Sequence, residues 1–163
     1  MSGIRAENTI PEMRVRRGLH AKGFRFRLHC RELPGKPDLV FPKYRAVIFV
    51  HGCFWHGHEC ALFKWPKTRE DFWKEKIEQN RIRDLAVIDE LARQGWRVLL
   101  VWECALKGKG RRLIDEVVDS CAEWLLSSST KHEIRGQHAT IDTANAHAKQ
   151  GLSDDLREGT RSK

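Results

Sequence analysis

The sequence contains no apolar run that approaches the roughly 18 residues needed to cross a membrane. Its first residues, Met1–Arg5, also lack the apolar core of a secretory signal peptide. Five cysteines are an odd number for a set of disulfides, and those nearest to histidines have the character of metal ligands. We therefore expect a protein of the reducing cytoplasm, with no membrane segment and with metal-binding thiols.

Acidic residues are in the minority, with 22 Asp and Glu against 30 Lys and Arg, which gives a formal net charge of +8. Such a balance suits a polyanion partner, because each phosphate that a protein neutralises releases counterions. The alternative is a basic protein whose charge serves only solubility. At 163 residues, with 40% hydrophobic residues and six Trp, the chain is long enough for one domain with a real core.

Hydrophobic periodicity predicts helices over residues 10–22, 69–94 and 113–126, and strands over 24–30, 38–41, 46–50 and 96–103. The first helix has Thr9 as its N-cap and Glu12 as the acid of a capping box. This order predicts an α/β sandwich in which helices flank a central mixed β-sheet. We expect one domain over residues 1–129. Residues 130–163 form a polar C-terminal extension without a clear core pattern, and we expect it to be largely disordered.

The stretch 46–60 concentrates the chemistry of the chain at the end of a predicted buried strand, where open α/β sheets usually carry their sites. Cys53, His58 and Cys60 are closely spaced, and Cys104 follows a later strand. Together they form a Cys₃His set, which is typical of a structural zinc site. The alternative is that these thiols are ordinary buried cysteines. Cys30 and Cys121 occupy core-like positions and are predicted to be packing residues.

Several carboxylates and imidazoles are candidates for acid–base and metal chemistry. Asp38 begins a strand after a Gly-Pro turn, and its oxygens suit a hard cation such as Mg²⁺, although Pro-Asp also occurs in ordinary turns. His51, His56 and Glu12 are candidates for the same cleft, and Glu12 has the alternative role of a capping acid. Asp84 lies within the apolar stripe of the long helix, so it needs a partner, either an imidazole or a neighbouring arginine, Arg81 or Arg83.

Phe54 and Trp55 lie between the predicted zinc ligands. Aromatic side chains on a positively charged face insert between base steps and kink a duplex, and the cost is lowest where a pair is already mismatched. The pair is therefore predicted to be a wedge for damaged duplex DNA. The alternative is that one of the two rings packs beneath the loop.

The sequence resembles the very short patch repair (Vsr) DNA mismatch endonucleases. The resemblance extends in order over about residues 4–124 and is carried by the segments 8–12, 33–41, 47–56, 66–68, 72–73, 83–84, 95–98 and 101–106. The run His51-Gly52-Cys53-Phe54-Trp55-His56 is its most specific part. It implies a restriction-endonuclease-like fold, and an enzyme that nicks duplex DNA on the 5′ side of the T in a T:G mispair left by deamination of 5-methylcytosine.

The resemblance also implies roles for individual residues. Asp38 matches the Mg²⁺-binding aspartate, with the backbone carbonyl of Val50 as a further ligand. His56 matches the catalytic histidine and Asp84 its hydrogen-bonding partner. His51 and Glu12 match the auxiliary active-site residues, and Phe54 and Trp55 match the intercalating pair. The zinc ligands are matched by Cys53, His58, Cys60 and Cys104.

The expected enzyme is thus a Mg²⁺-dependent hydrolase with structural Zn²⁺, acting as a monomer on T:G-mismatched duplex DNA. Mismatch-repair proteins and a DNA polymerase are expected downstream, and the cytoplasmic nucleoid is the expected location. Two alternatives come from other classes of protein. One is an endonuclease of the same fold that cuts without regard to mismatch, and the other is a zinc-stapled DNA-binding module with no catalytic activity.

Overall fold

The computed structural model describes residues 7–137, and the last twenty residues, where disorder is expected, lie outside that range. Its elements in chain order are α1 (Ile10–Ala21), β1 (Arg27–Leu28), β2 (Leu39–Phe41), η1 (Pro42–Tyr44), β3 (Ala46–His51), α2 (Glu70–Arg93), β4 (Arg97–Trp102), η2 (Glu103–Ala105), α3 (Ile114–Leu126) and β5 (Lys131–Ile134). No helix in the described residues is both long and apolar enough to cross a membrane.

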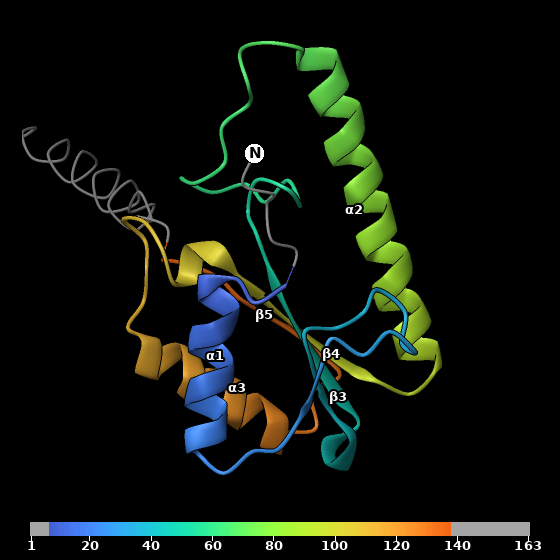
Figure 1. Ribbon diagram of the computed structural model, residues 1–163, viewed down its shortest axis with the longest axis vertical. Helices are drawn as coiled ribbons and strands as arrows, with labels where there is room; N and C mark the ends of the chain where they lie inside the picture. The colour runs from blue at the N-terminus through green and yellow to red at the C-terminus, as the bar shows by residue number, and fades with distance from the viewer. Residues whose placement is uncertain (1–6, 138–163) are drawn as a thin grey trace, which may run out of the picture.

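The strands form one five-stranded mixed sheet in the order β1-β2-β3-β4-β5. β1, β2 and β3 pair antiparallel, whereas β3, β4 and β5 pair parallel. Helices α1 and α3 lie on one side of the sheet and the long α2 lies on the other (Figure 1). The predicted mixed sheet flanked by helices is confirmed.

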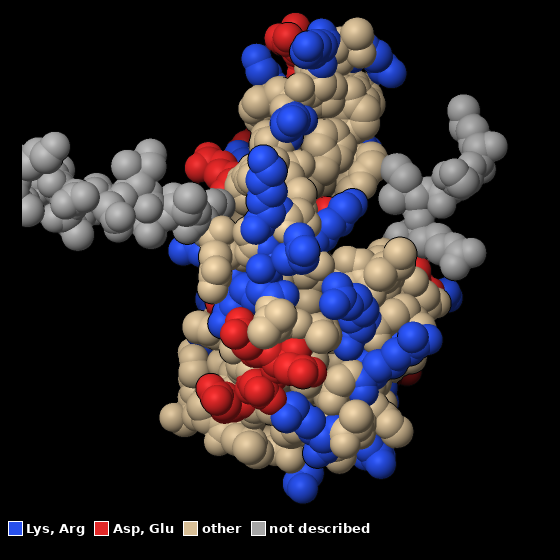
Figure 2. All heavy atoms as spheres, turned by 90° about the vertical axis from the view of Figure 1, so that its left-hand side faces the viewer, with Lys and Arg blue, Asp and Glu red and all other residues tan. Residues whose placement is uncertain are grey.

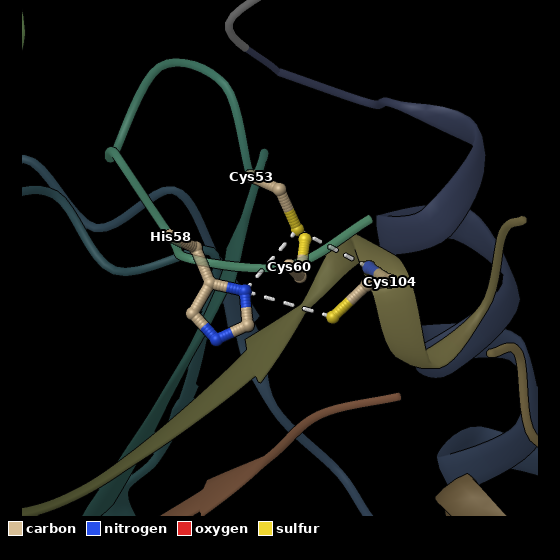
Figure 3. A group of neighbouring side chains, drawn as sticks. All are labelled: Cys53, His58, Cys60 and Cys104. Carbon is tan, nitrogen blue, oxygen red and sulfur yellow. Dashed lines mark hydrogen bonds between the residues drawn. The ribbon is translucent and has the colours of Figure 1, made fainter. Parts of the chain in front are cut away.

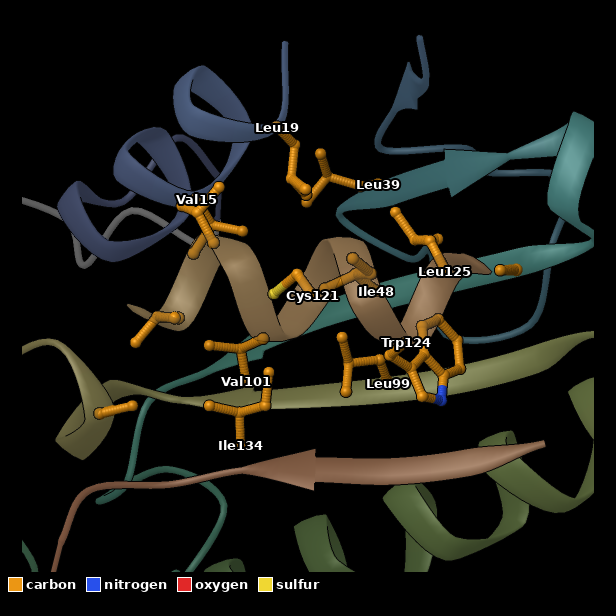
Figure 4. Packing of buried hydrophobic residues seen from close by; sticks show 14 of the residues in the cluster. Val15, Leu19, Leu39, Ile48, Leu99, Val101, Cys121, Trp124, Leu125 and Ile134 are labelled. Carbon is orange, nitrogen blue, oxygen red and sulfur yellow. The ribbon is translucent and has the colours of Figure 1, made fainter. Parts of the chain in front are cut away.

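The central strands are apolar on both faces because each face is covered. Along β3, Ala46 and Ile48 face the core under α1 and α3, and Val47 and Phe49 face the core under α2. β4 alternates in the same way, with Leu99 in the first core. Figure 4 shows side chains of the first core interdigitating between the sheet and the two helices. This two-sided burial makes the end of β3 a rigid base for the loop that follows.

The two edge strands differ from the sequence prediction. The strand expected over 24–30 is reduced to Arg27–Leu28, because His29 takes a left-handed conformation (φ 46°) and ends the pairing. Phe24 and Phe26 still pack on the core. The alternating apolar residues therefore indicate side chains that are buried, although their backbone does not pair with β2. In addition, β5 pairs with β4 beyond residue 129, so the ordered fold continues into the expected extension.

Candidate active site and metal centre

The four predicted zinc ligands converge beside the ends of two parallel strands. Cys53, His58 and Cys60 come from the loop after β3, and Cys104 comes from the turn after β4 (Figure 3). One ligand atom from each residue lies within 4.8 Å of the others. His58 Nδ1 is 3.6 Å from the sulfurs of both Cys53 and Cys104. In a tetrahedral zinc site with bonds of usual length, a sulfur and a nitrogen ligand lie about 3.5 Å apart. The observed separations are close to this value, so the four donors fit zinc.

The surroundings of the cluster favour ligation. The Cys104 backbone N–H donates to Cys53 Sγ and the Gly136 N–H donates to Cys104 Sγ, each at 3.3 Å. A hydrogen bond from Cys53 lowers the pKa of the Cys104 thiol to about 5 and raises the pKa of Cys53. Burial lowers the pKa of His58. These shifts favour a thiolate at Cys104 and a neutral imidazole at His58, the protonation states that a metal requires.

A histidine–carboxylate pair joins the same loop to α2. His56 Nδ1 lies 2.6 Å from Asp84 Oδ2, and both side chains are about one-quarter exposed. Arg81, one of the alternative partners for Asp84, instead donates to the Gly57 carbonyl. The predicted Asp–imidazole contact is thus present, and it leaves Nε2 of His56 free of this bond.

His51, the last residue of β3, lies flat against His56 with ring centroids 3.7 Å apart. Burial lowers the pKa of His51 well below its ordinary value, so its ring is neutral. Its Nδ1 is buried without a hydrogen-bond partner among the described residues. A buried nitrogen of this kind is an available acceptor or ligand at the edge of the site.

Asp38 lies next to β3 on the other side of this site. The Val50 backbone N–H donates to Asp38 Oδ2 at 2.7 Å, which fixes the carboxylate beside the Val50 peptide. Burial raises the pKa of Asp38 to about 7, with the Glu12 carboxylate adding to the rise and the Val50 hydrogen bond opposing it. A half-buried carboxylate of this kind suits a divalent cation, because a bound ion stabilises its charged form.

Glu12 also reaches this region from α1. Its carboxylate is buried, accepts from the Asn8 backbone N–H at 2.9 Å, and lies 2.6 Å from His29 Nε2. One ligand atom from each of Glu12, His29 and Asp38 falls within a 4.8 Å group. The Thr9 side chain accepts from the Glu12 N–H, as expected of the N-cap. The Glu12 carboxylate therefore binds a backbone N–H just before α1 and also lies close to Asp38.

Phe54 and Trp55 are half-buried and meet edge to face at 5.2 Å. Trp73 from α2 contacts both rings, at 5.4 and 5.9 Å. Neither ring is fully buried, and Phe54 also stacks on Phe63 of the same loop. Trp55 and His56 also line a cavity of about 510 Å³, together with Val50, His51 and residues of α1 and α2. Trp55 and the two stacked histidines thus open onto the same space.

Comparison with known proteins identifies the family. A family model described as DNA mismatch endonuclease Vsr matches residues 1–62. The chain is 44% identical over 147 residues to the DNA mismatch endonuclease Vsr of Escherichia coli, and the alignment covers 90% of each chain. This chain belongs to the Vsr family.

Two nicking enzymes are similar to this Vsr family member as well. It is 54% identical over 110 residues to the type II nicking enzyme V.XorIIP of Xanthomonas oryzae pv. oryzae, which covers 68% of this chain and 81% of that enzyme. It is 44% identical over 126 residues to V.NmeAIP of Neisseria meningitidis, which covers 74% and 90% respectively.

Three residues at the site of this Vsr chain were not among the sequence predictions. The sequence pattern places His29 on a basic strand face, and its contact with Glu12 depends on the left-handed turn that ends β1. Lys76 and Asn80 line the cavity from α2, and Asn80 donates to the Trp55 carbonyl at 2.9 Å. Their spacing of four residues places them on one helix face, but only the position of the loop shows which face is inward.

Proposed function

We propose that this protein is a mismatch-specific DNA endonuclease that nicks one strand 5′ of the T in T:G mispairs formed by deamination of 5-methylcytosine. The observation that carries the proposal is the grouping of Asp38, the His56–Asp84 pair and the Phe54–Trp55 pair at the end of β3. Val50, His56 and Trp55 of this group line one cavity. A restriction-endonuclease-like fold, Mg²⁺ dependence and structural Zn²⁺ belong to the proposal. So do action as a monomer on the nucleoid and hand-over to mismatch-repair proteins and a DNA polymerase.

The aromatic pair opens the duplex in this proposal. The rings of Phe54 and Trp55 enter the stack at the mispair, where separating the bases costs least. Trp73 and the zinc-bound loop support the pair from behind, so the rings keep their orientation when bases press on them. The distorted strand then lies over the cavity that His56 lines.

Hydrolysis follows from the placement of the polar groups. Asp84 accepts from Nδ1–H of His56 and fixes its tautomer, so that Nε2 takes a proton from the attacking water. The neutral, stacked His51 limits the ways in which the His56 ring can turn. Asp38 and the Val50 carbonyl would hold Mg²⁺, which when bound neutralises charge that develops on the phosphate and the leaving oxygen. The products carry a 3′-hydroxyl and a 5′-phosphate.

The test compares labelled duplexes that differ only in one pair, T:G or C:G, incubated with protein and Mg²⁺. We expect a single nick confined to the T strand of the T:G duplex. Asp38→Asn and His56→Ala are expected to abolish it, while His20→Ala, a change in an exposed histidine on α1, leaves it unchanged. Equal cutting of both duplexes would support an endonuclease without mismatch specificity. Binding without any nick would support a DNA-binding module.

A further inference from the structure

Aromatic contacts continue outward from the wedge along the loop between β3 and α2. Phe63 stacks on Phe54 with centroids 6.0 Å apart and ring planes 26° apart. Trp65 meets Phe63 edge to face at 4.9 Å. Phe54 and Phe63 are half-buried, whereas the Trp65 side chain is 46% exposed. The series therefore ends in a large indole ring that is open to solvent.

The loop around Trp65 is held in place rather than loosely attached. Cys60, a member of the proposed zinc cluster, lies a few residues before it, and Leu62 packs beside Gly108 and against the core under α2. Trp65 itself rests on Phe63. A ring that is fixed in this way loses little conformational freedom when it binds, and this makes it an efficient contact residue.

The charge around Trp65 indicates the chemistry of its partner. Lys64 and Lys67 flank it in sequence and are exposed, and the Arg69 guanidinium lies over the Phe72 ring at 4.1 Å. One face of the molecule carries Lys and Arg side chains across its middle, with a group of carboxylates below them (Figure 2). Aromatic rings interleaved with cations are characteristic of surfaces that bind nucleic acids.

We propose that Trp65, with Lys64 and Lys67, forms a second DNA contact, which holds the duplex beside the mispair while Phe54 and Trp55 open it. The ring packs on a base or deoxyribose of the flanking segment, and the two ammonium groups bind its phosphates. The continuous ring contacts from Phe54 to Trp65 make this contact an extension of the wedge. The inference rests on the proposed function, because it takes the wedge as the mismatch-binding element.

The test measures binding to T:G duplexes whose flanks are shortened base pair by base pair from either end. His56→Ala is the parent in every arm, so that no substrate is cut. On long duplexes we expect Trp65→Ala to weaken binding about fivefold or more, as for the removal of an aromatic–base contact. When one flank becomes too short to reach Trp65, we expect the affinity of the His56→Ala parent to fall by the same factor. The parent and the Trp65→Ala variant then bind the duplex with equal affinity.

Three further variants complete the experiment. Trp65→Phe is expected to keep most of the affinity, and Leu113→Ala, a change in an exposed apolar side chain at the N-cap of α3, to match the parent at every length. The double variant Lys64→Ala/Lys67→Ala is expected to reduce the salt slope of binding by about 0.9 for each phosphate that the lysines no longer neutralise.

Two results would overturn the inference. One is equal affinity of Trp65→Ala and the parent on long duplexes, which would leave the exposed indole to some other partner. The other is a weakening that stays constant down to the shortest duplex, which would mean that Trp65 acts only by supporting the wedge. Failure of the unsubstituted protein to nick T:G duplexes would overturn the proposed function, and a length-dependent weakening with Trp65→Ala would still support the contact.

Discussion

Among single residues, the contact between Asp84 and His56 has the most direct consequence for catalysis. Asp84→Asn keeps the size of the side chain but replaces an obligatory acceptor with an amide, so the preferred tautomer of His56 is no longer fixed. We expect the single-turnover nicking rate to fall about 100-fold, with little change in DNA affinity. Asp89→Asn on the same helix removes only an exposed partner of Arg93 and is the matched control. A rate close to that of the unsubstituted protein would exclude Asp84 from positioning the base.

The buried carboxyl of Asp38 makes stability depend on pH. Its pKa in the folded protein, about 7, exceeds the ordinary 3.8, so the folded state binds this proton more tightly than the unfolded state. In Mg²⁺-free buffer its contribution to the free energy of unfolding is therefore fully present below about pH 4, falls by about 4 kcal/mol as pH rises to about 8, and is constant above that. Urea unfolding of the unsubstituted and Asp38→Asn proteins across this range isolates the contribution.

Mg²⁺ is expected to act in the opposite direction, since a bound cation favours the ionised carboxylate. It should therefore raise the unfolding temperature more at pH 8 than at pH 5, and Asp38→Asn should remove that difference. A pH-independent difference between the two proteins would contradict the burial argument.

Residue patterns predicted one of the two contacts that orient polar groups here. The apolar stripe of α2 required a partner for Asp84, and His56 is that partner. The contact between His29 and Glu12 has no such signal, because it joins a strand end to a helix through a left-handed backbone turn. Helical periodicity specifies which side chains share a face, but a turn between elements is specified only by the tertiary packing.

At the level of elements, the loop between β3 and α2 depends on the cysteine–histidine cluster. We expect one equivalent of zinc per chain, and expect its removal by a chelator to lower the unfolding temperature by about 10 °C or more and to stop nicking. Cys60→Ser should reproduce both effects. Cys30→Ser is the control, because Cys30 is a half-buried thiol outside the cluster. Unchanged zinc content in Cys60→Ser would remove that residue from the ligand set.

Long elements were predictable from the sequence, whereas the edge strand β1 is shorter than predicted and the edge strand β5 was not predicted. The ends of α2, expected at 69 and 94, are observed at Glu70 and Arg93, because twenty or more residues of pattern constrain them. β5 has only Ile134 buried, so it shows no apolar pattern. Its start is guided by Arg97, whose guanidinium donates to backbone carbonyls of Trp124, Leu125, Ser127 and Ser129. A long-range contact of this kind leaves no local signal.

For the whole molecule, the formal charge of +8 predicts a strong dependence of DNA binding on salt. We expect a plot of log affinity against log salt concentration to have a slope of about −4 or steeper, because each neutralised phosphate contributes about −0.9. The plots for matched and mismatched duplexes should have nearly the same slope, and the mismatched duplex should bind more tightly at every salt concentration. Anisotropy titrations from about 50 to about 400 mM salt measure both, and a nearly flat line would exclude phosphate contacts as the main source of affinity.

The cluster of Cys53, His58, Cys60 and Cys104 also affects when the protein becomes active. His56 and the Phe54–Trp55 pair lie between candidate ligands on the same short loop, so in the proposed function a single ion would organise both the recognition of damage and its incision. A newly made copy that has not yet acquired zinc would be unable to find a lesion and equally unable to break a strand. Under the proposed function, zinc supply would then limit when newly made molecules become active.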